Sequence, residues 1–192
     1  MSLKIGIDVG STTVKVIVLS EENELLYRSY ERHFSMVREK TCELLEKTGD
    51  LLTGQKVRAV ITGSAGLGMA KSANVNFVQE VFATAEAVEQ FIPDTDAVVE
   101  LGGEDAKIIY FTGGLEERMN GVCAGGTGSF IDQMAALMQM DAAALDREAA
   151  NYREVYPIAA RCGVFAKSDI QPLINDGATK ADLAASVFQA VV

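Results

Sequence analysis

The segments GIDVGSTTVKVIVL (residues 6–19) and VVELGGEDAKIIYF (residues 98–111) share one pattern. In each, an apolar run ends in an acidic residue, a short Gly-containing turn follows, and a Lys opens a second apolar run. The matches are Asp8 with Glu100, Gly10 with Gly102, Thr13 with Asp105 and Lys15 with Lys107; the offset is constant, since 100 − 8 and 107 − 15 both give 92. An acid, a Gly and a Lys rarely fall in one register by chance, so the repeat predicts two similar β-hairpins.

Each predicted hairpin suits a polyphosphate. A tight turn of small residues presents backbone N–H groups to an anion. The acid that ends the first strand can hold Mg²⁺ or its waters, and the Lys adds positive charge beside the phosphates. Two such hairpins facing each other across a cleft would bind a polyphosphate from both sides; the alternative is two unrelated hairpins with Gly turns. The hairpin residues predicted to bind phosphate are Gly10, Ser11, Thr12, Thr13, Lys15, Gly102, Gly103 and Lys107, and those predicted to hold Mg²⁺ or act in catalysis are Asp8, Glu100 and Asp105.

Strand-like and helix-like segments alternate along the rest of the chain. Residues 22–34 and 57–63 have strand patterns, and residues 36–52, 79–91 and 180–192 have helical spacing. This alternation predicts an α/β protein. We expect a mixed sheet of about five strands within residues 4–111, of ordinary size. Residues 1–112 should form a first lobe and residues 113–192 the start of a second. The last helical pattern lacks a stop signal, so we expect the second lobe to be truncated.

Composition narrows the class of protein. The net charge of -10 argues against a nucleic-acid partner, which needs clustered Lys and Arg. No apolar run approaches the roughly 20 residues that cross a bilayer, and the first residues show no secretory leader. We therefore expect a cytoplasmic protein without a membrane partner. An acidic protein can still bind ATP, because backbone N–H groups and Mg²⁺ hold phosphates locally.

Two loops carry the remaining candidates. In GVCAGGTGSF (residues 121–130), the residues Gly125, Gly126, Thr127 and Gly128 open an apolar helix, which is a favourable site for an anion. The alternative is a flexible loop in which Thr127 or Ser129 caps the helix. RCGVFAKSD (residues 161–169) is the second loop and holds Cys162. Cys42 lies in a helical pattern and is expected to be a small buried side chain. The single histidine, His33, is given no role.

These motifs together resemble a known family. DVGSTTVK (8–15) and ELGGEDAK (100–107) look like the first and second phosphate motifs of the superfamily of actin, heat-shock chaperones and sugar kinases. NGVCAGGTGSFIDQMA (120–135) and RCGVFAKSDI (161–170) are similar to the two cysteine motifs of the ATPase activators of 2-hydroxyacyl-CoA dehydratases and benzoyl-CoA reductases. The resemblance runs from Ile5 to the C-terminus. It implies an actin-like, ribonuclease H-like ATPase fold with the two hairpins paired around ATP and Mg²⁺.

The resemblance also implies a redox centre. Members of the family are homodimers that share one [4Fe–4S] cluster, and the matching cysteines here are Cys123 and Cys162. ATP binding and hydrolysis change the dimer angle, and an electron from a low-potential donor such as ferredoxin or flavodoxin passes through the cluster to the dehydratase or reductase. The residues agree with this scheme, because such a cluster needs four thiolates and two chains about a two-fold axis supply them. A Zn²⁺ site built in the same way is the alternative.

The sequence departs from the family's pattern in three places. Glu100 stands where single-domain activators usually have Asp, and Glu104 where they have Gln. The family's late Gly-Gly adenosine motif is also missing from these residues. Two other interpretations stay open. A small-molecule kinase of the sugar-kinase branch would use the hairpins but not Cys123 and Cys162, and a non-catalytic module of a larger polypeptide would no longer hydrolyse ATP.

Overall fold

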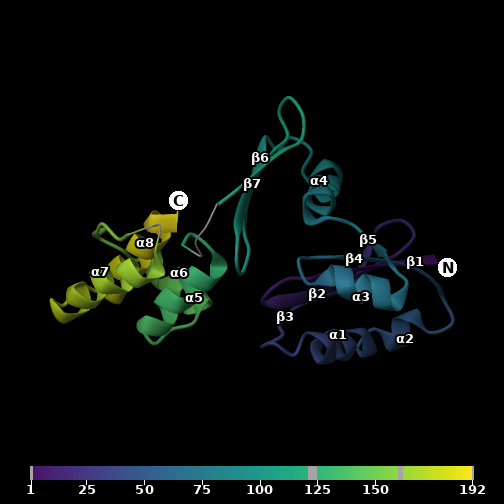
Figure 1. The fold of residues 1–192 in the computed structure, drawn as a ribbon, viewed down its shortest axis with the longest axis horizontal. Coiled ribbons are helices and arrows are strands. Elements are labelled where there is room, and N and C mark those ends of the chain that lie inside the picture. Colours follow the sequence, from purple (N-terminus) through teal and green to yellow (C-terminus); the bar gives the residue numbers. More distant parts are fainter. Residues whose placement is uncertain (1, 121–124, 160–161, 192) are drawn as a thin grey trace. The chain divides into compact units, whose positions relative to one another are not determined.

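A computed structural model describes residues 2–120, 125–159 and 162–191. The chain divides into two compact units, Met1–Asp96 and Ala97–Val192, and Figure 1 shows the elements of each. This division differs from the expected one between residues 112 and 113. The second hairpin, residues 97–110, pairs with the strand at residues 116–119 and therefore groups with the residues that follow it. In the described part of the chain, no helix is both long and apolar enough to cross a membrane.

The N-terminal unit contains a five-stranded mixed sheet in the order β3-β2-β1-β4-β5. Its strands are β1 Ser2–Val9, β2 Thr13–Leu19, β3 Leu25–Arg32, β4 Lys56–Thr62 and β5 Asn76–Phe77. β1, β2 and β3 pair antiparallel, whereas β4 runs parallel to β1 and β5 runs parallel to β4. The expectation of a mixed five-stranded sheet is confirmed, but its extent was wrong: the sheet ends at Phe77 and does not include the second hairpin.

Four helices belong to this unit: α1 Val37–Glu46, α2 Gly49–Leu52, α3 Gly66–Ala73 and α4 Glu80–Phe91. β1 alternates strictly between half-buried and buried residues. Its buried side chains form a core with Leu44 of α1 and Ala70 of α3. Because successive strand residues point to opposite faces, Gly6 and Asp8 lie on the face away from this core.

Two expectations about α1 were wrong. The helical pattern over residues 36–52 is two helices, because the chain turns at Thr48, whose buried hydroxyl donates to the Leu45 carbonyl. Cys42 is exposed, not buried. The helix turns Thr41 and Leu44 toward the interior, so the residue after Thr41 points outward.

Among its described residues, the C-terminal unit contains a three-stranded antiparallel sheet, β6-β7-β8, and four helices. The elements are β6 Ala97–Leu101, β7 Ala106–Tyr110, β8 Glu116–Met119, α5 Gly128–Leu137, α6 Ala142–Ala149, α7 Gly163–Asn175 and α8 Lys180–Val191. Phe130 and Met134 of α5, Leu145 of α6, Ile170 of α7 and Leu183 of α8 are buried together in one core. This core fixes the start of α5, which carries the Gly-rich loop.

Candidate functional site

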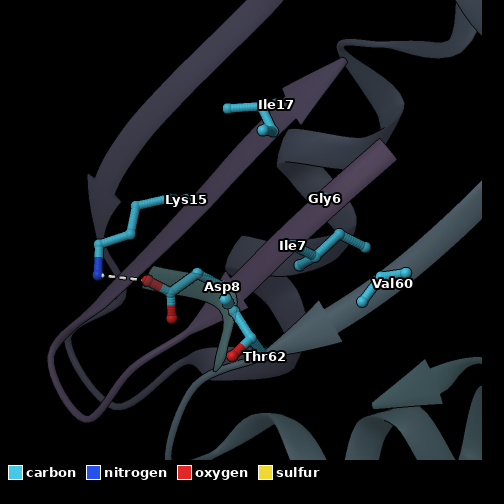
Figure 2. A pocket seen from close by; sticks show the side chains of 8 residues that line it. Gly6, Ile7, Asp8, Lys15, Ile17, Val60 and Thr62 are labelled. Carbon is cyan, nitrogen blue, oxygen red and sulfur yellow. Dashed lines mark hydrogen bonds and ion pairs between the residues drawn. The ribbon is translucent and has the colours of Figure 1, made fainter. Parts of the chain in front are cut away.

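Asp8 lies in the middle of a row of three polar residues on adjacent strands. In the register of the sheet, Asp8 of β1 stands opposite Lys15 of β2 and opposite Thr62 of β4. Directly opposed residues on neighbouring strands point to the same face. Asp8 Oδ2 accepts a hydrogen bond from Lys15 Nζ at 2.7 Å, and Figure 2 shows the two side chains pointing toward each other. The row lines a cavity of ≈ 250 Å³ that extends along the sheet past Gly6, Ile17 and Val60.

The second oxygen of Asp8 faces a crowded turn. Asp8 Oδ1 and Thr62 Oγ1 are both buried, and neither has a hydrogen-bond partner among the described residues. Gly63 follows β4 with φ 97°, a left-handed conformation that favours glycine. A Cβ on Gly63 would lie 2.5 Å from Asp8 Oδ1 and 2.3 Å from the Val9 carbonyl oxygen. The chain therefore passes Asp8 as closely as a backbone without a side chain allows.

The turn that joins β1 to β2 is held from two directions. Gly10 N–H donates to the Thr13 carbonyl at 2.9 Å within the turn. From outside, His33 Nε2 lies 3.2 Å from the Gly10 carbonyl oxygen, and the His33 N–H donates to the Thr12 carbonyl. His33 is only 4% exposed. The sequence alone does not predict this contact, because a single histidine at the end of a polar strand belongs to no recognisable motif.

The second hairpin repeats the pairing of the first. Glu100 of β6 stands opposite Lys107 of β7, as Asp8 stands opposite Lys15. Lys107 Nζ lies 3.9 Å from Glu100 Oε2 and 3.6 Å from Asp105 Oδ2, and the lysine is only 4% exposed. A Cβ on Gly102 would lie 2.5 Å from Asp105 Oδ1 and 3.0 Å from the Asp105 carbonyl oxygen, so a larger residue here would require Asp105 to move. The predicted repeat is thus confirmed as two hairpins with the same acid–lysine register.

The Gly-rich loop meets the second hairpin at its turn. Gly128 N–H donates to the Gly102 carbonyl at 2.8 Å, and a Cβ on Gly128 would approach that same oxygen to 3.2 Å. Thr127 is buried and caps α5 by accepting from the Phe130 N–H. At the other end of the loop, Asn120 Oδ1 accepts from the Ala106 N–H at the start of β7. The structure therefore brings Gly125–Gly128 together with the hairpin turn and the N-terminus of α5.

Residues 5–192 match the family described as the BadF/BadG/BcrA/BcrD ATPase family. The chain belongs to the BadF/BadG/BcrA/BcrD ATPase family. It is 28% identical to the 2-hydroxyisocaproyl-CoA dehydratase activator of Clostridioides difficile, over 97% of this chain and 71% of that protein. It is also 28% identical to the (R)-2-hydroxyglutaryl-CoA dehydratase activating ATPase of Acidaminococcus fermentans, over 97% of this chain and 73% of that protein.

A solved structure of a relative extends the match from sequence to fold. The activator of the 2-hydroxyisocaproyl-CoA dehydratase from Clostridium difficile, with bound ADPNP, superposes with a TM-score of 0.86 at 26% identity. The alignment covers 98% of this chain and 72% of that one. The expected α/β, actin-like ATPase fold is therefore confirmed for this member of the BadF/BadG/BcrA/BcrD ATPase family.

The described residues include Cys162 of the second cysteine motif but not the cysteine of the first. Cys162 is half-buried and forms the N-cap of α7, where its carbonyl accepts from the Ala166 N–H. Val164 and Phe165, which follow Gly163 in the first turn of α7, are 71% and 64% exposed. Cys123 lies outside the described residues. Among the described residues, no group of three or more His, Cys, Asp or Glu side chains is arranged to hold a metal ion.

The predicted site residues are divided between the two units. Asp8, Gly10, Ser11, Thr12, Thr13 and Lys15 lie together in the N-terminal unit, and Glu100, Gly102, Gly103, Asp105, Lys107 and Gly125–Gly128 lie together in the C-terminal unit. Their roles, and the approach of the two hairpin turns across one cleft, stay predictions.

Proposed function

We propose that the chain binds and hydrolyses MgATP as a homodimer. The resulting change in the dimer angle would drive the transfer of an electron to a 2-hydroxyacyl-CoA dehydratase or benzoyl-CoA reductase partner. The observation that carries this proposal is the repeated acid–lysine hairpin in a chain that matches two dehydratase activators over 97% of its length. The relative with bound ADPNP supports a nucleotide site in this fold.

The first hairpin fits a magnesium nucleotide. Mg²⁺ prefers hard oxygen ligands and usually keeps several waters, so one or two carboxylates suffice to hold it. Asp8 offers such an oxygen: Oδ2 is held by Lys15, and Oδ1 has no hydrogen-bond partner among the described residues. When bound, Mg²⁺ would neutralise charge on the phosphate oxygens. Lys15 would keep its positive charge at the phosphates while holding the carboxylate in place.

The second hairpin and the Gly-rich loop supply the other half of the proposed phosphate site. The turn at Gly102–Asp105 and the N-terminus of α5 are joined by the Gly128–Gly102 hydrogen bond. A helix N-terminus attracts anions through its unpaired N–H groups and its dipole. Because the loop that carries this N-terminus also contains Cys123, a change at the phosphates would reach a cluster ligand within a few residues.

The proposed [4Fe–4S] cluster would be held by Cys123 and Cys162 of two chains. The position of Cys162 before α7 supports it, since the positive end of a helix dipole stabilises a more negative cluster. The exposed Val164 and Phe165 beside Cys162 are apolar surface suited to a subunit interface. A low-potential donor such as ferredoxin or flavodoxin would reduce the cluster.

Hydrolysis by an Asp8→Asn variant tests the nucleotide part of the proposal. The substitution keeps the side-chain size and removes the charge that would hold Mg²⁺. We expect the rate of phosphate release from ATP to fall by at least about tenfold, which is the loss typical when a group that positions a metal ion is removed. The control is Asp50→Asn, which changes an exposed aspartate on α2. A parent rate of hydrolysis in Asp8→Asn would mean that the first hairpin is only structural.

A further inference from the structure

We infer that Thr62 is a further Mg²⁺-positioning residue: its hydroxyl and Asp8 Oδ1 hold Mg²⁺, or a water bound to it, from two adjacent strands. This inference rests on the proposed nucleotide function and extends it to a residue outside both hairpins. The ligand chemistry is that of a hydrated divalent cation, which takes neutral and anionic oxygens alike.

The register of the sheet brings the two oxygens together. Asp8 and Thr62 are direct partners in the parallel β1–β4 pair, so their side chains leave the sheet on the same face. Both residues line the cavity beside the hairpin, and Figure 2 shows them next to each other at the ends of their strands. Lys15 occupies the other side of Asp8. Lys15 of β2 therefore holds one oxygen of the Asp8 carboxylate, while Thr62 stands on the opposite side of Asp8, on β4.

The hydrogen bonding of the two oxygens points to a ligand. Buried polar atoms in proteins are nearly always hydrogen-bonded, and one left without a partner costs about 1–3 kcal/mol. Asp8 Oδ1 and Thr62 Oγ1 are both buried and do not bond each other or any other described group. A carboxylate oxygen accepts only, whereas a hydroxyl donates and accepts. A Mg²⁺ ion or its bound water would satisfy both.

The turn after Thr62 fixes this arrangement. The Ala65 N–H donates to the Val9 carbonyl at 2.9 Å, which ties the turn to the end of β1. Gly63 lies so close that a Cβ would be 2.5 Å from Asp8 Oδ1. Thr62 is thus held beside Asp8 by the backbone, and its buried hydroxyl makes no hydrogen bond among the described residues.

A Thr62→Val variant, which replaces the hydroxyl with a methyl group of the same shape, tests the inference. The readouts are the dissociation constant of a fluorescent ATP analogue with Mg²⁺ and with EDTA, and the binding of Mn²⁺ to the nucleotide complex by electron paramagnetic resonance. We expect binding with Mg²⁺ to weaken about tenfold, as for other metal-positioning groups, and binding in EDTA to stay at the parent value. Thr62→Ser should restore Mg²⁺-dependent binding.

Thermal melting of the nucleotide-free protein separates this role from a structural one. Thr62→Val should keep the parent melting temperature, because its hydroxyl has no hydrogen bond to lose among the described residues. The matched control Thr48→Val loses the bond to the Leu45 carbonyl and should melt lower while its Mg²⁺ dependence is unchanged. If Thr62→Val binds like the parent, or weakens equally in EDTA, the inference is wrong and the proposed function stands. If the parent protein itself binds no nucleotide, the proposed function fails and the inference with it.

Discussion

His33 Nε2 donates a hydrogen bond to the carbonyl oxygen of Gly10 across 3.2 Å, and so links the end of β3 to the turn of the first hairpin. The direction of this bond follows from the other ring nitrogen. His33 Nδ1 accepts from the Ser35 N–H at 3.1 Å, so the proton of a neutral ring is on Nε2. The buried ring thereby fixes the carbonyl of Gly10, and with it the N–H groups that the turn would present to a phosphate in the proposed nucleotide site.

Replacing the His33 imidazole with a ring that has no nitrogen atoms tests this link. His33→Phe keeps the bulk but removes the ring's hydrogen bonds with the Gly10 carbonyl and the Ser35 N–H, each worth about 0.5–1.5 kcal/mol of folding free energy. We expect a lower melting temperature and ATP binding weakened about tenfold or less, because the turn loses its orientation. His33→Gln, which keeps a donor, should recover part of the affinity. Parent-like affinity in His33→Phe would show that the hairpin alone sets the turn.

Gly63 offers a second test, with a control inside the same unit. Gly63→Ala would place a methyl group 2.3 Å from the Val9 carbonyl oxygen and 2.5 Å from Asp8 Oδ1. Gly54 also has a positive φ, 75°, but a Cβ there meets nothing within 4 Å. Gly54→Ala therefore measures the backbone strain alone, about 1 kcal/mol.

We expect Gly63→Ala to lower the free energy of unfolding more than Gly54→Ala and, unlike Gly54→Ala, to reduce ATP binding. Urea unfolding and nucleotide titration measure the two effects. Equal losses of stability in both variants would mean that the turn can move away from Asp8, and would contradict the tight packing described for this site.

The hairpins were predictable from sequence because their register is local. An acid and a Lys on either side of a short turn are forced to oppose each other once the two strands pair, so the spacing of Asp8 and Lys15 already contained their contact. The same argument holds for Glu100 and Lys107. The fold class and the family followed from these two segments and the cysteine loops.

The parts that sequence analysis missed depend on contacts across long separations. Thr62 meets Asp8 only because β4 pairs parallel to β1, and His33 meets Gly10 only because β3 pairs with β2 over its full length. The spacing of residues along the chain near Thr62 or His33 does not predict either pairing. β8 was missed for a different reason: its residues are all exposed, so it has no apolar alternation to recognise.

Asp182 in α8 predicts how the C-terminal unit responds to acid. Its Oδ1 accepts from the N–H groups of Arg153 and Glu154, and its Oδ2 accepts from the Thr179 hydroxyl at 2.6 Å. These bonds, that of Thr179 first, hold the pKa of the Asp182 carboxyl below its usual value of 3.8. A lowered folded-state pKa adds stability that is present above the unfolded pKa and is lost as pH falls through the folded one.

We therefore expect Asp182→Asn to melt below the parent at pH 7, with the difference shrinking as the pH falls below about 4. Melting temperatures measured between pH 7 and pH 3 check this. Asp146→Asn, which changes an exposed aspartate on α6, should follow the parent curve. A difference between parent and Asp182→Asn that is constant with pH would assign the loss to hydrogen-bond geometry and not to charge.

The three cysteines give the sharpest test of the proposed redox role. After anaerobic reconstitution with iron and sulfide, two chains should hold about four irons, because a [4Fe–4S] cluster needs four thiolates. Cys123→Ser and Cys162→Ser should each lose this iron. Cys42→Ser should keep it, although Cys42 is exposed on α1 and open to iron in solution. Iron and zinc counting with sedimentation distinguishes the outcomes: zinc retained in place of iron would indicate a structural metal site, and equal iron in all three variants would make Cys123 and Cys162 packing residues.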